Sequence, residues 1–234
     1  MRHCLLLLVG LGAASPGHAG IMQFATRTAF HAAAGSLASE GFEHCRRATI
    51  VFTGPLDAAH PGPACGVGTL ITGVRLSDAG APGDQSLYIA APHYSANRSS
   101  AIGQNGPAAD ALALDFATPT RAVGFDVFQN FGGGAQLGRA ASFGIDLWSA
   151  DTRLGHFTIG VPSGRGAFFG AISDGAPITR AEINNPLAYD LVDNIAFAPT
   201  RSALVPSGAA PAPEPGAIAL LALGSGLLAT VRRR

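Results

Sequence analysis

The feature that most constrains this fold is a series of short apolar or alternating segments separated by glycine, proline, asparagine and aspartate. No helical pattern of about ten residues lies between them, which favours antiparallel strands over a parallel sheet. The predicted strands are residues 49–52, 69–76, 86–90, 111–116, 122–129, 143–150, 156–161, 167–172, 178–183 and 193–198. We therefore predict one all-β domain over residues 20–200, an antiparallel β-sandwich of the jelly-roll type with a short helix at residues 26–35.

Alternation along the strands sorts their side chains onto two faces. The inward faces, which should fill the space between the sheets, carry Leu112, Leu114, Phe116, Val123, Phe125, Val127, Phe143, Ile145 and Leu147. The opposite faces carry Asp115, Asp126, Phe128, Asp146 and Trp148, the only tryptophan of the chain.

A ligand-binding platform is predicted from these outward residues. If their strands are neighbours, Phe128 and Trp148 form an aromatic surface on which a sugar ring can stack, while Asp126 and Asp146 accept hydrogen bonds from its hydroxyl groups. The alternative is that Trp148 packs beneath a loop and the aspartates are merely solvated.

The N-terminus, MRHCLLLLVGLGAASPGHAG, has the three parts of a secretory signal. A short polar start precedes an apolar run, and small residues follow at the spacing that a signal peptidase requires. We expect residues 1–19 to be a signal helix that is removed after Ala19 on export. The alternative is a buried N-terminal strand or helix.

Two cysteines remain after such a cleavage, Cys45 and Cys65. Export brings the chain into an oxidising compartment, where an isolated pair is expected to form a disulfide. A metal or redox pair would require the closer spacing of a C-x-x-C motif and companion cysteines. A disulfide is therefore the prediction.

The C-terminus combines a proline-rich linker, residues 201–215, with an apolar segment and three terminal arginines, residues 216–234. A helix over residues 216–231 would be about 24 Å long, a short span for roughly 30 Å of bilayer hydrocarbon. Arginines at its end would anchor it on the cytoplasmic side. A single transmembrane helix is expected, the alternative being a helix buried in the domain.

The order Pro213-Glu214-Pro215, apolar segment, Arg232-Arg233-Arg234 closely resembles the PEP-CTERM sorting signal of exported proteins of Gram-negative bacteria. The resemblance covers only this tail, and alanine precedes Pro213 where valine is more usual. It implies a transient anchor in the inner membrane, recognised and cut near the motif by an exosortase, a membrane-embedded protease. It also implies a final place at the cell surface or in the extracellular matrix.

Two segments of the body, EGFEHC and VDNIAF, resemble the first and last strands of calcium-holding, carbohydrate-binding jelly rolls. The resemblance implies that Glu43 and Asp193 meet at a sheet edge and bind a structural Ca²⁺. Two carboxylates supply few of the six or more oxygens that calcium takes, and Asp193 could equally cap a turn.

The charge balance and the motifs of the chain bear on its activity and partners. Fifteen arginines balance fifteen acidic residues and lysine is absent, which argues against nucleic acid as a partner. No zinc-protease, nucleophile-elbow or phosphate-loop motif occurs in the mature region, so an enzyme is not expected. The leading hypothesis is a non-enzymatic surface or matrix protein that binds extracellular polysaccharide. The alternatives are a glycan hydrolase with Asp126 and Asp146 as paired carboxylates, and a purely structural or adhesive protein.

Overall fold

The computed structural model describes residues 20–45, 50–79, 86–94, 98–105, 111–129, 140–184 and 190–199. All of them belong to one unit, Met1–Thr200. The predicted signal helix, the linker and the sorting tail lie outside the described residues. Across the described part of the chain, no helix combines the length and the apolar character that crossing a bilayer requires.

Antiparallel strands dominate, as predicted. The elements are β1 (Ile21–Phe24), α1 (Arg27–Ala34), β2 (Ala38–Glu40), β3 (Ile50–Thr53), β4 (Val74–Asp78), β5 (Ser86–Ala90), the 3₁₀ helix η1 (Pro92–Tyr94), β6 (Ala101–Gln104), β7 (Ala111–Gln129), β8 (Ala141–Ser149), β9 (Thr152–Val161), β10 (Gly166–Ser173), β11 (Ile178–Asn184) and β12 (Asp190–Pro199). Each predicted strand overlaps an observed one, although the prediction for residues 69–76 shares only residues 74–76 with β4. The short strands β1, β2 and β6 were not predicted.

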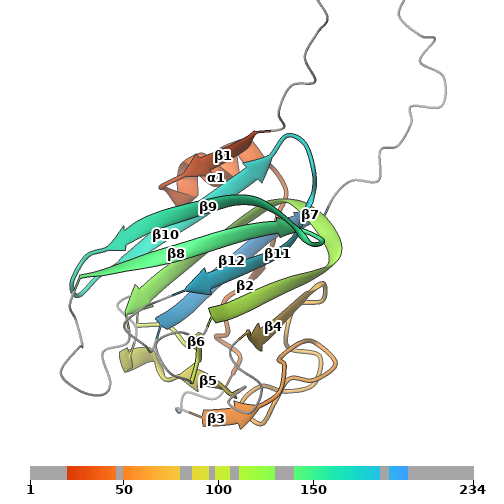
Figure 1. The fold of residues 1–234 in the computed structure, drawn as a ribbon. Coiled ribbons are helices and arrows are strands. Elements are labelled where there is room, and N and C mark those ends of the chain that lie inside the picture. Colours follow the sequence, from red (N-terminus) through yellow and green to blue (C-terminus); the bar gives the residue numbers. More distant parts are fainter. Residues whose placement is uncertain are drawn as a thin grey trace, which may run out of the picture. The chain divides into compact units, whose positions relative to one another are not determined.

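Two of the predicted strands, 111–116 and 122–129, are one strand of 19 residues, β7. Residues 111–116 of β7 pair with β4 and β11, whereas residues 122–129 pair with β10 and β12. The strand bends between these halves and passes from one layer to the other (Figure 1). A single hydrogen-bonded sheet of twelve strands therefore folds over into a sandwich within the described residues.

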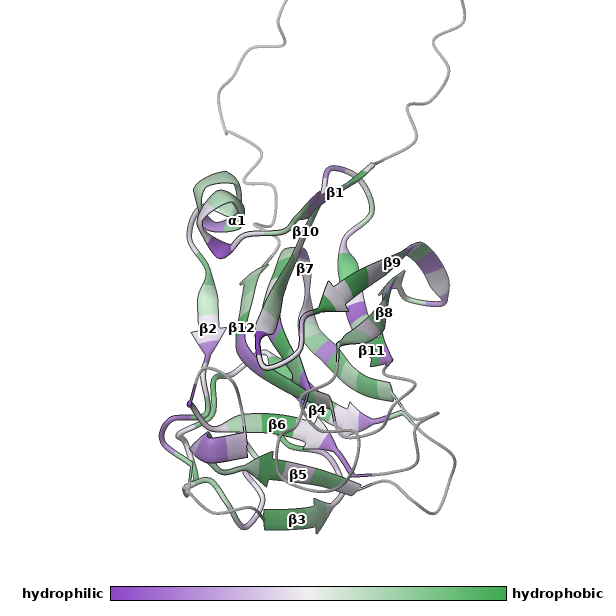
Figure 2. Cartoon of the chain, turned by 90° about the vertical axis from the view of Figure 1, so that its left-hand side faces the viewer, coloured by the Kyte–Doolittle hydropathy of each residue, from purple (hydrophilic) through white to green (hydrophobic). Residues whose placement is uncertain are grey.

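We call the two layers the β8 layer and the β12 layer. The β8 layer contains β9, β8, β11, the first half of β7 and β4. The β12 layer contains the second half of β7 with β1, β10, β12, β2, β6, β5 and β3. Figure 2 shows β8, β9 and β11 on one side and β10 and β12 on the other.

The core lies between the layers and confirms the predicted inward faces. The predicted inward residues of β7 and β8 all belong to one buried cluster. Phe169 of β10, Ile183 of β11 and Ile195 of β12 also belong to this cluster, each with no exposed surface. The side chains that point outward from both layers can therefore contact a packed helix or a ligand.

Helix α1 covers part of the outer face of the β12 layer. Thr26 caps its first turn by accepting a hydrogen bond from the backbone N–H of Ala29, and Gly35, at φ 75°, ends it. The Phe30 ring lies on the paired glycines Gly124 and Gly170, where an added Cβ would come within 2.8 Å of a ring carbon at either position. The absent side chains of these glycines make room for the helix.

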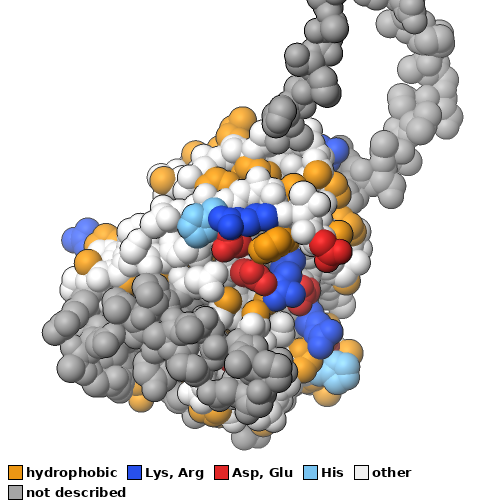
Figure 3. Space-filling model, in the orientation of Figure 1, with side chains coloured by type: hydrophobic (Ala, Val, Ile, Leu, Met, Phe, Trp, Pro, Cys, Tyr) orange, Lys and Arg blue, Asp and Glu red, His pale blue; other side chains and the backbone are white. Residues whose placement is uncertain are grey.

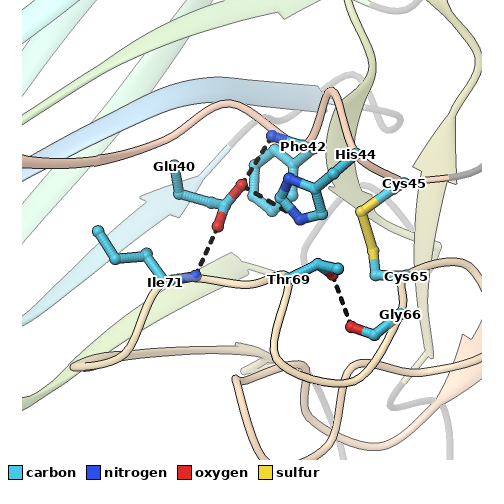
Figure 4. The surroundings of a disulfide bond; sticks show 8 residues. All are labelled: Glu40, Phe42, His44, Cys45, Cys65, Gly66, Thr69 and Ile71. Carbon is cyan, nitrogen blue, oxygen red and sulfur yellow. Dashed lines mark hydrogen bonds and ion pairs between the residues drawn. A yellow bond between two sulfur atoms is a disulfide. The ribbon is translucent and has the colours of Figure 1, made fainter.

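The predicted Cys45–Cys65 disulfide is present (Figure 4). Close to it, the buried carboxylate of Glu40 accepts hydrogen bonds from the backbone N–H groups of Phe42 and Ile71, both at 2.8 Å. The side chain of His44 lies 3.7 Å from the same carboxylate. The disulfide and Glu40 together join the segment that follows β2 to the segment that precedes β4.

Candidate ligand-binding face

The outer face of the β8 layer carries two rows of side chains that cross its strands. Pairing in register aligns the first row, Arg75, Asp115, Arg180, Trp148 and Arg153. It aligns the second row in the same way, Ser77, Ala113, Glu182, Asp146 and His156. We call these two rows the Trp148 face. Figure 3 shows basic and acidic side chains gathered there around an apolar one.

A β-bulge helps to assemble this face. Pairing of β8 with β9 shifts between Leu147 and Trp148, so that Trp148 stands opposite Arg153 although Leu147 stands opposite Gly155. Such a bulge changes the face to which the following residues point. Arg153 consequently reaches the same face as Asp146, and its Nε lies 2.7 Å from the Asp146 carboxylate.

Trp148 is held at its indole edge. Its Nε1–H donates a hydrogen bond of 3.2 Å to Glu182 Oε2 on the neighbouring strand β11. The other oxygen of Glu182 lies 2.8 Å from one terminal guanidinium nitrogen of Arg180. The other terminal nitrogen of Arg180 lies 3.7 Å from the Asp115 carboxylate. The indole is half-buried, so part of the ring stays open to solvent while its polar edge is fixed.

Asp146 forms the centre of a second charged group on the same face. Its Oδ1 lies 2.7 Å from Nε of Arg153 and 3.0 Å from Nδ1 of His156. The three acids of the face, Asp115, Glu182 and Asp146, are therefore each paired with a basic side chain.

Phe128 is not part of the Trp148 face, and that prediction is wrong. It points outward, as the alternation indicated, but from the second half of β7, in the β12 layer. Side chains of β5, β6 and β12 cover it and leave 3 % of its surface exposed. The ring also lies against Gly166, where an added Cβ would come within 2.2 Å of Phe128 Cε1.

Asp126 is also separated from Asp146, again because β7 changes layers. In the β12 layer it forms an ion pair of 2.9 Å with Arg27 of α1 and accepts a hydrogen bond from Nδ2 of Asn194. Asp126 and Asp146 project from the outer faces of opposite layers, with the core between them. They cannot act as the paired carboxylates of a glycan hydrolase.

The two residues suggested for calcium have different surroundings. Asp193 is fully buried and accepts hydrogen bonds from the Ser99 hydroxyl and the backbone N–H of Asn194. Glu43 is exposed in the turn that follows β2. Among the described residues, the group of potential ligands that lies close together is His44 with the two disulfide cysteines, and it includes neither carboxylate. Calcium binding stays a prediction.

Several residues of the site were not among the predicted ones. Arg180 and Glu182 alternate with the buried Ala181 and Ile183 in the sequence ITRAEIN, which is a readable outward pattern. The sequence does not say that this strand lies beside Trp148. Arg153 had no signal of this kind, because a bulge determines its face.

Comparison with known proteins gives no family for this chain: no family model and no curated protein matches it. One similar solved structure is the CBM22-1–GH10 part of xylanase 10B from Clostridium thermocellum, complexed with xylohexaose, with a TM-score of 0.37, 11% identity, and coverage of 70% of this chain and 29% of that chain. Another is the K1 cleaved adhesin domain of Lys-gingipain from Porphyromonas gingivalis W83, with a TM-score of 0.25, 13% identity, and coverage of 70% and 99%. Likeness at this level carries no argument about function.

Proposed function

We propose that this chain is an exported surface or matrix protein whose jelly-roll-like sandwich binds extracellular polysaccharide through the Trp148 face. The observation that carries the proposal is a half-open indole fixed by Glu182 on an outer sheet face and surrounded by charged side chains. Sugar rings stack on such aromatic surfaces, while their hydroxyl groups bond to fixed polar groups around the ring.

The fixed positions of the charged side chains on the Trp148 face support ligand binding. Ion pairs hold Arg180, Glu182, Asp146 and Arg153 in place before a ligand arrives. Preorganised groups lose little side-chain entropy on binding, so more of the contact energy appears as affinity. We propose binding without a catalytic step.

Export and sorting form the second part of the proposal. The disulfide is a feature of proteins that leave the reducing cytoplasm. We propose that the signal segment directs export and that Pro213-Glu214-Pro215 with Arg232-Arg233-Arg234 presents the protein to an exosortase-type protease while the tail is in the inner membrane. The folded domain would then reach the cell surface or matrix of a Gram-negative bacterium.

Affinity electrophoresis of the secreted protein through gels that contain different polysaccharides tests the binding. We expect retardation by at least one polysaccharide, and a loss of affinity of about tenfold or more in Trp148→Ala, since the stacking surface disappears. Met22→Ala is the matched control, because Met22 is an exposed apolar residue of β1 in the other layer.

Unchanged thermal unfolding of Trp148→Ala would show that the variant is folded. Equal retardation of the wild type and Trp148→Ala would refute the role of the face. The absence of retardation by every polysaccharide would leave a structural or adhesive role.

A further inference from the structure

The Trp148 face continues into a cavity at its β4 end. The cavity has a volume of about 340 Å³, and Arg75, Ser77 and Arg180, which belong to the two rows, contribute to its wall together with Gly54 and Pro55. It is therefore part of the same surface on which Trp148 lies. A ligand on the indole can extend into it without crossing to another face.

The cavity wall carries two arginines, Arg75 and Arg180, and one acidic residue, Asp78. Along β4, Arg75 is exposed and Ser77 half-buried, whereas the alternate residues Val74, Leu76 and Asp78 are buried. Asp78 therefore belongs to the inward side of the strand, although it contributes to the cavity wall. The cations that face outward at the cavity are Arg75 and Arg180.

These two arginines differ in their partners. Arg180 is neutralised by Glu182 at 2.8 Å and by Asp115 at 3.7 Å. Arg75 is exposed, and within the part of the chain that the structure describes no acidic side chain forms an ion pair with it. Arg75 thus offers an exposed guanidinium that the described residues do not hold in an ion pair, while Asp115, which stands opposite it in register, is paired with Arg180.

The backbones of Trp148 and Arg75 are farther apart than one sugar ring is long. They lie three strands apart in the first row, and strands lie about 4.8 Å apart, which separates their backbones by roughly 14 Å. A ring on Trp148 and a group above the backbone of Arg75 then belong to different units of one chain. The ligand consequently runs across the strands rather than along them.

We infer that the Trp148 face binds an acidic polysaccharide, with one sugar ring stacked on Trp148 and a carboxylate of another unit paired with Arg75 at the cavity. This inference rests on the proposed binding function and specifies its ligand class. A guanidinium binds a carboxylate through two parallel N–H···O bonds, which gives both charge and orientation. Ser77 offers a hydroxyl group beside it.

The test compares matched polymers that differ only in charge. Polygalacturonate and alginate are each paired with their esterified forms, which keep the sugar chain but lose the carboxylate charge. Affinities of the full secreted protein are measured by calorimetry for the wild type, Arg75→Ala, Arg75→Lys and Trp148→Ala. Arg165→Ala is the control, because Arg165 is an exposed arginine at a different cavity, beside Phe168.

The expected result is a preference of about tenfold or more for at least one acidic polymer over its ester, at low ionic strength. Arg75→Ala removes this preference but keeps the affinity for the ester, and Arg75→Lys restores part of it. Arg165→Ala leaves it unchanged. Trp148→Ala weakens binding of the acid and the ester alike.

The two proposals fail in different ways. Trp148-dependent binding without a preference for the charged polymer, or a preference that Arg75→Ala does not change, overturns the inference and leaves the binding function intact. Binding that does not depend on Trp148, or no binding to any of the four polymers while neutral polysaccharides bind, also overturns it. Absence of binding to any polysaccharide overturns both.

Discussion

Trp148 and Glu182 stand on neighbouring strands, and the indole Nε1–H of the first donates a hydrogen bond of 3.2 Å to the carboxylate of the second. Glu182 also pairs with Arg180 at 2.8 Å, so one carboxylate fixes both the aromatic ring and the adjacent cation. This arrangement makes Glu182 the positioning residue of the Trp148 face.

Replacing Glu182 by alanine should weaken polysaccharide binding more than it weakens the fold. The variant leaves the indole unanchored, and we expect a loss of affinity of several fold, with a change in unfolding free energy of about 1 kcal/mol or less, as for other half-exposed ion pairs. Calorimetric binding and urea unfolding measure the two quantities. A large loss of stability with unchanged affinity would contradict the positioning role, and Glu182→Gln should retain the indole contact.

Phe30 and Gly124 should show strong coupling in stability. Gly124→Ala places a Cβ within 2.8 Å of the Phe30 ring and should cost about 1–3 kcal/mol through overpacking. Phe30→Ala should cost about 3–5 kcal/mol, since it removes a fully buried ring. In the double variant the alanine at 124 no longer meets that ring, while the Phe168 ring, 2.9 Å from the added Cβ, stays in place. We expect the double variant to lose less than the sum of the two, measured by urea unfolding; simple additivity would speak against the contact.

Reduction of the Cys45–Cys65 disulfide should lower the unfolding free energy by about 3 kcal/mol in the chain-entropy model, because the bridge closes a loop with a sequence separation of 20. The unreduced, denatured mature protein should contain no reactive thiol, whereas the reduced protein should contain two. Urea unfolding with and without a reducing agent measures the stability. Equal midpoints in both conditions would show that the bridge does not contribute.

The turn at Asp57 should become weaker in acid. Desolvation by burial raises the pKa of the Asp57 carboxyl, but hydrogen bonds from the backbone N–H groups of His60 and Ala59, together with the His60 side chain, hold it below its ordinary value of 3.8. The folded pKa is thus lower than the unfolded one. The stabilisation by the ionised group is complete above the unfolded pKa and is lost as the pH falls through the folded pKa.

We therefore expect Asp57→Ala to be less stable than the wild type at neutral pH and the difference to shrink as the pH falls below 3.8. Thermal unfolding of both proteins at several pH values measures this difference. Asp151→Ala is a suitable control, because Asp151 is an exposed aspartate in the turn between β8 and β9. A difference that grows in acid would contradict the direction of the shift.

Local sequence pattern predicted the strands and their faces because both depend on neighbouring residues. The alternation from Phe143 to Trp148 is enough to tell inward from outward side chains, and the structure agrees. Thr26 and Gly35 likewise mark the ends of α1 through capping and backbone preference, which are local effects.

The partners of each strand could not be predicted in the same way. The segment ATPTR, residues 117–121, reads as a turn because of Pro119, but the chain continues through it as one strand that changes layers. Phe128 and Asp126 were consequently assigned to the face of Trp148, when they lie in the other layer. Glu40 was not among the predicted residues for a similar reason: burial of a carboxylate depends on a distant segment, here the backbone N–H of Ile71.

The course of β7 has a consequence for how the sandwich responds to a ligand. One half of the strand is paired with β11 beneath the Trp148 face and the other half with β10 and β12. Neither layer can melt without removing hydrogen-bonding partners from a strand that the other layer also needs, so the two should unfold in a single cooperative transition. A polysaccharide bound to the Trp148 face of the β8 layer then also stabilises the β12 layer, including the surface on which helix α1 packs, against thermal unfolding and proteolysis.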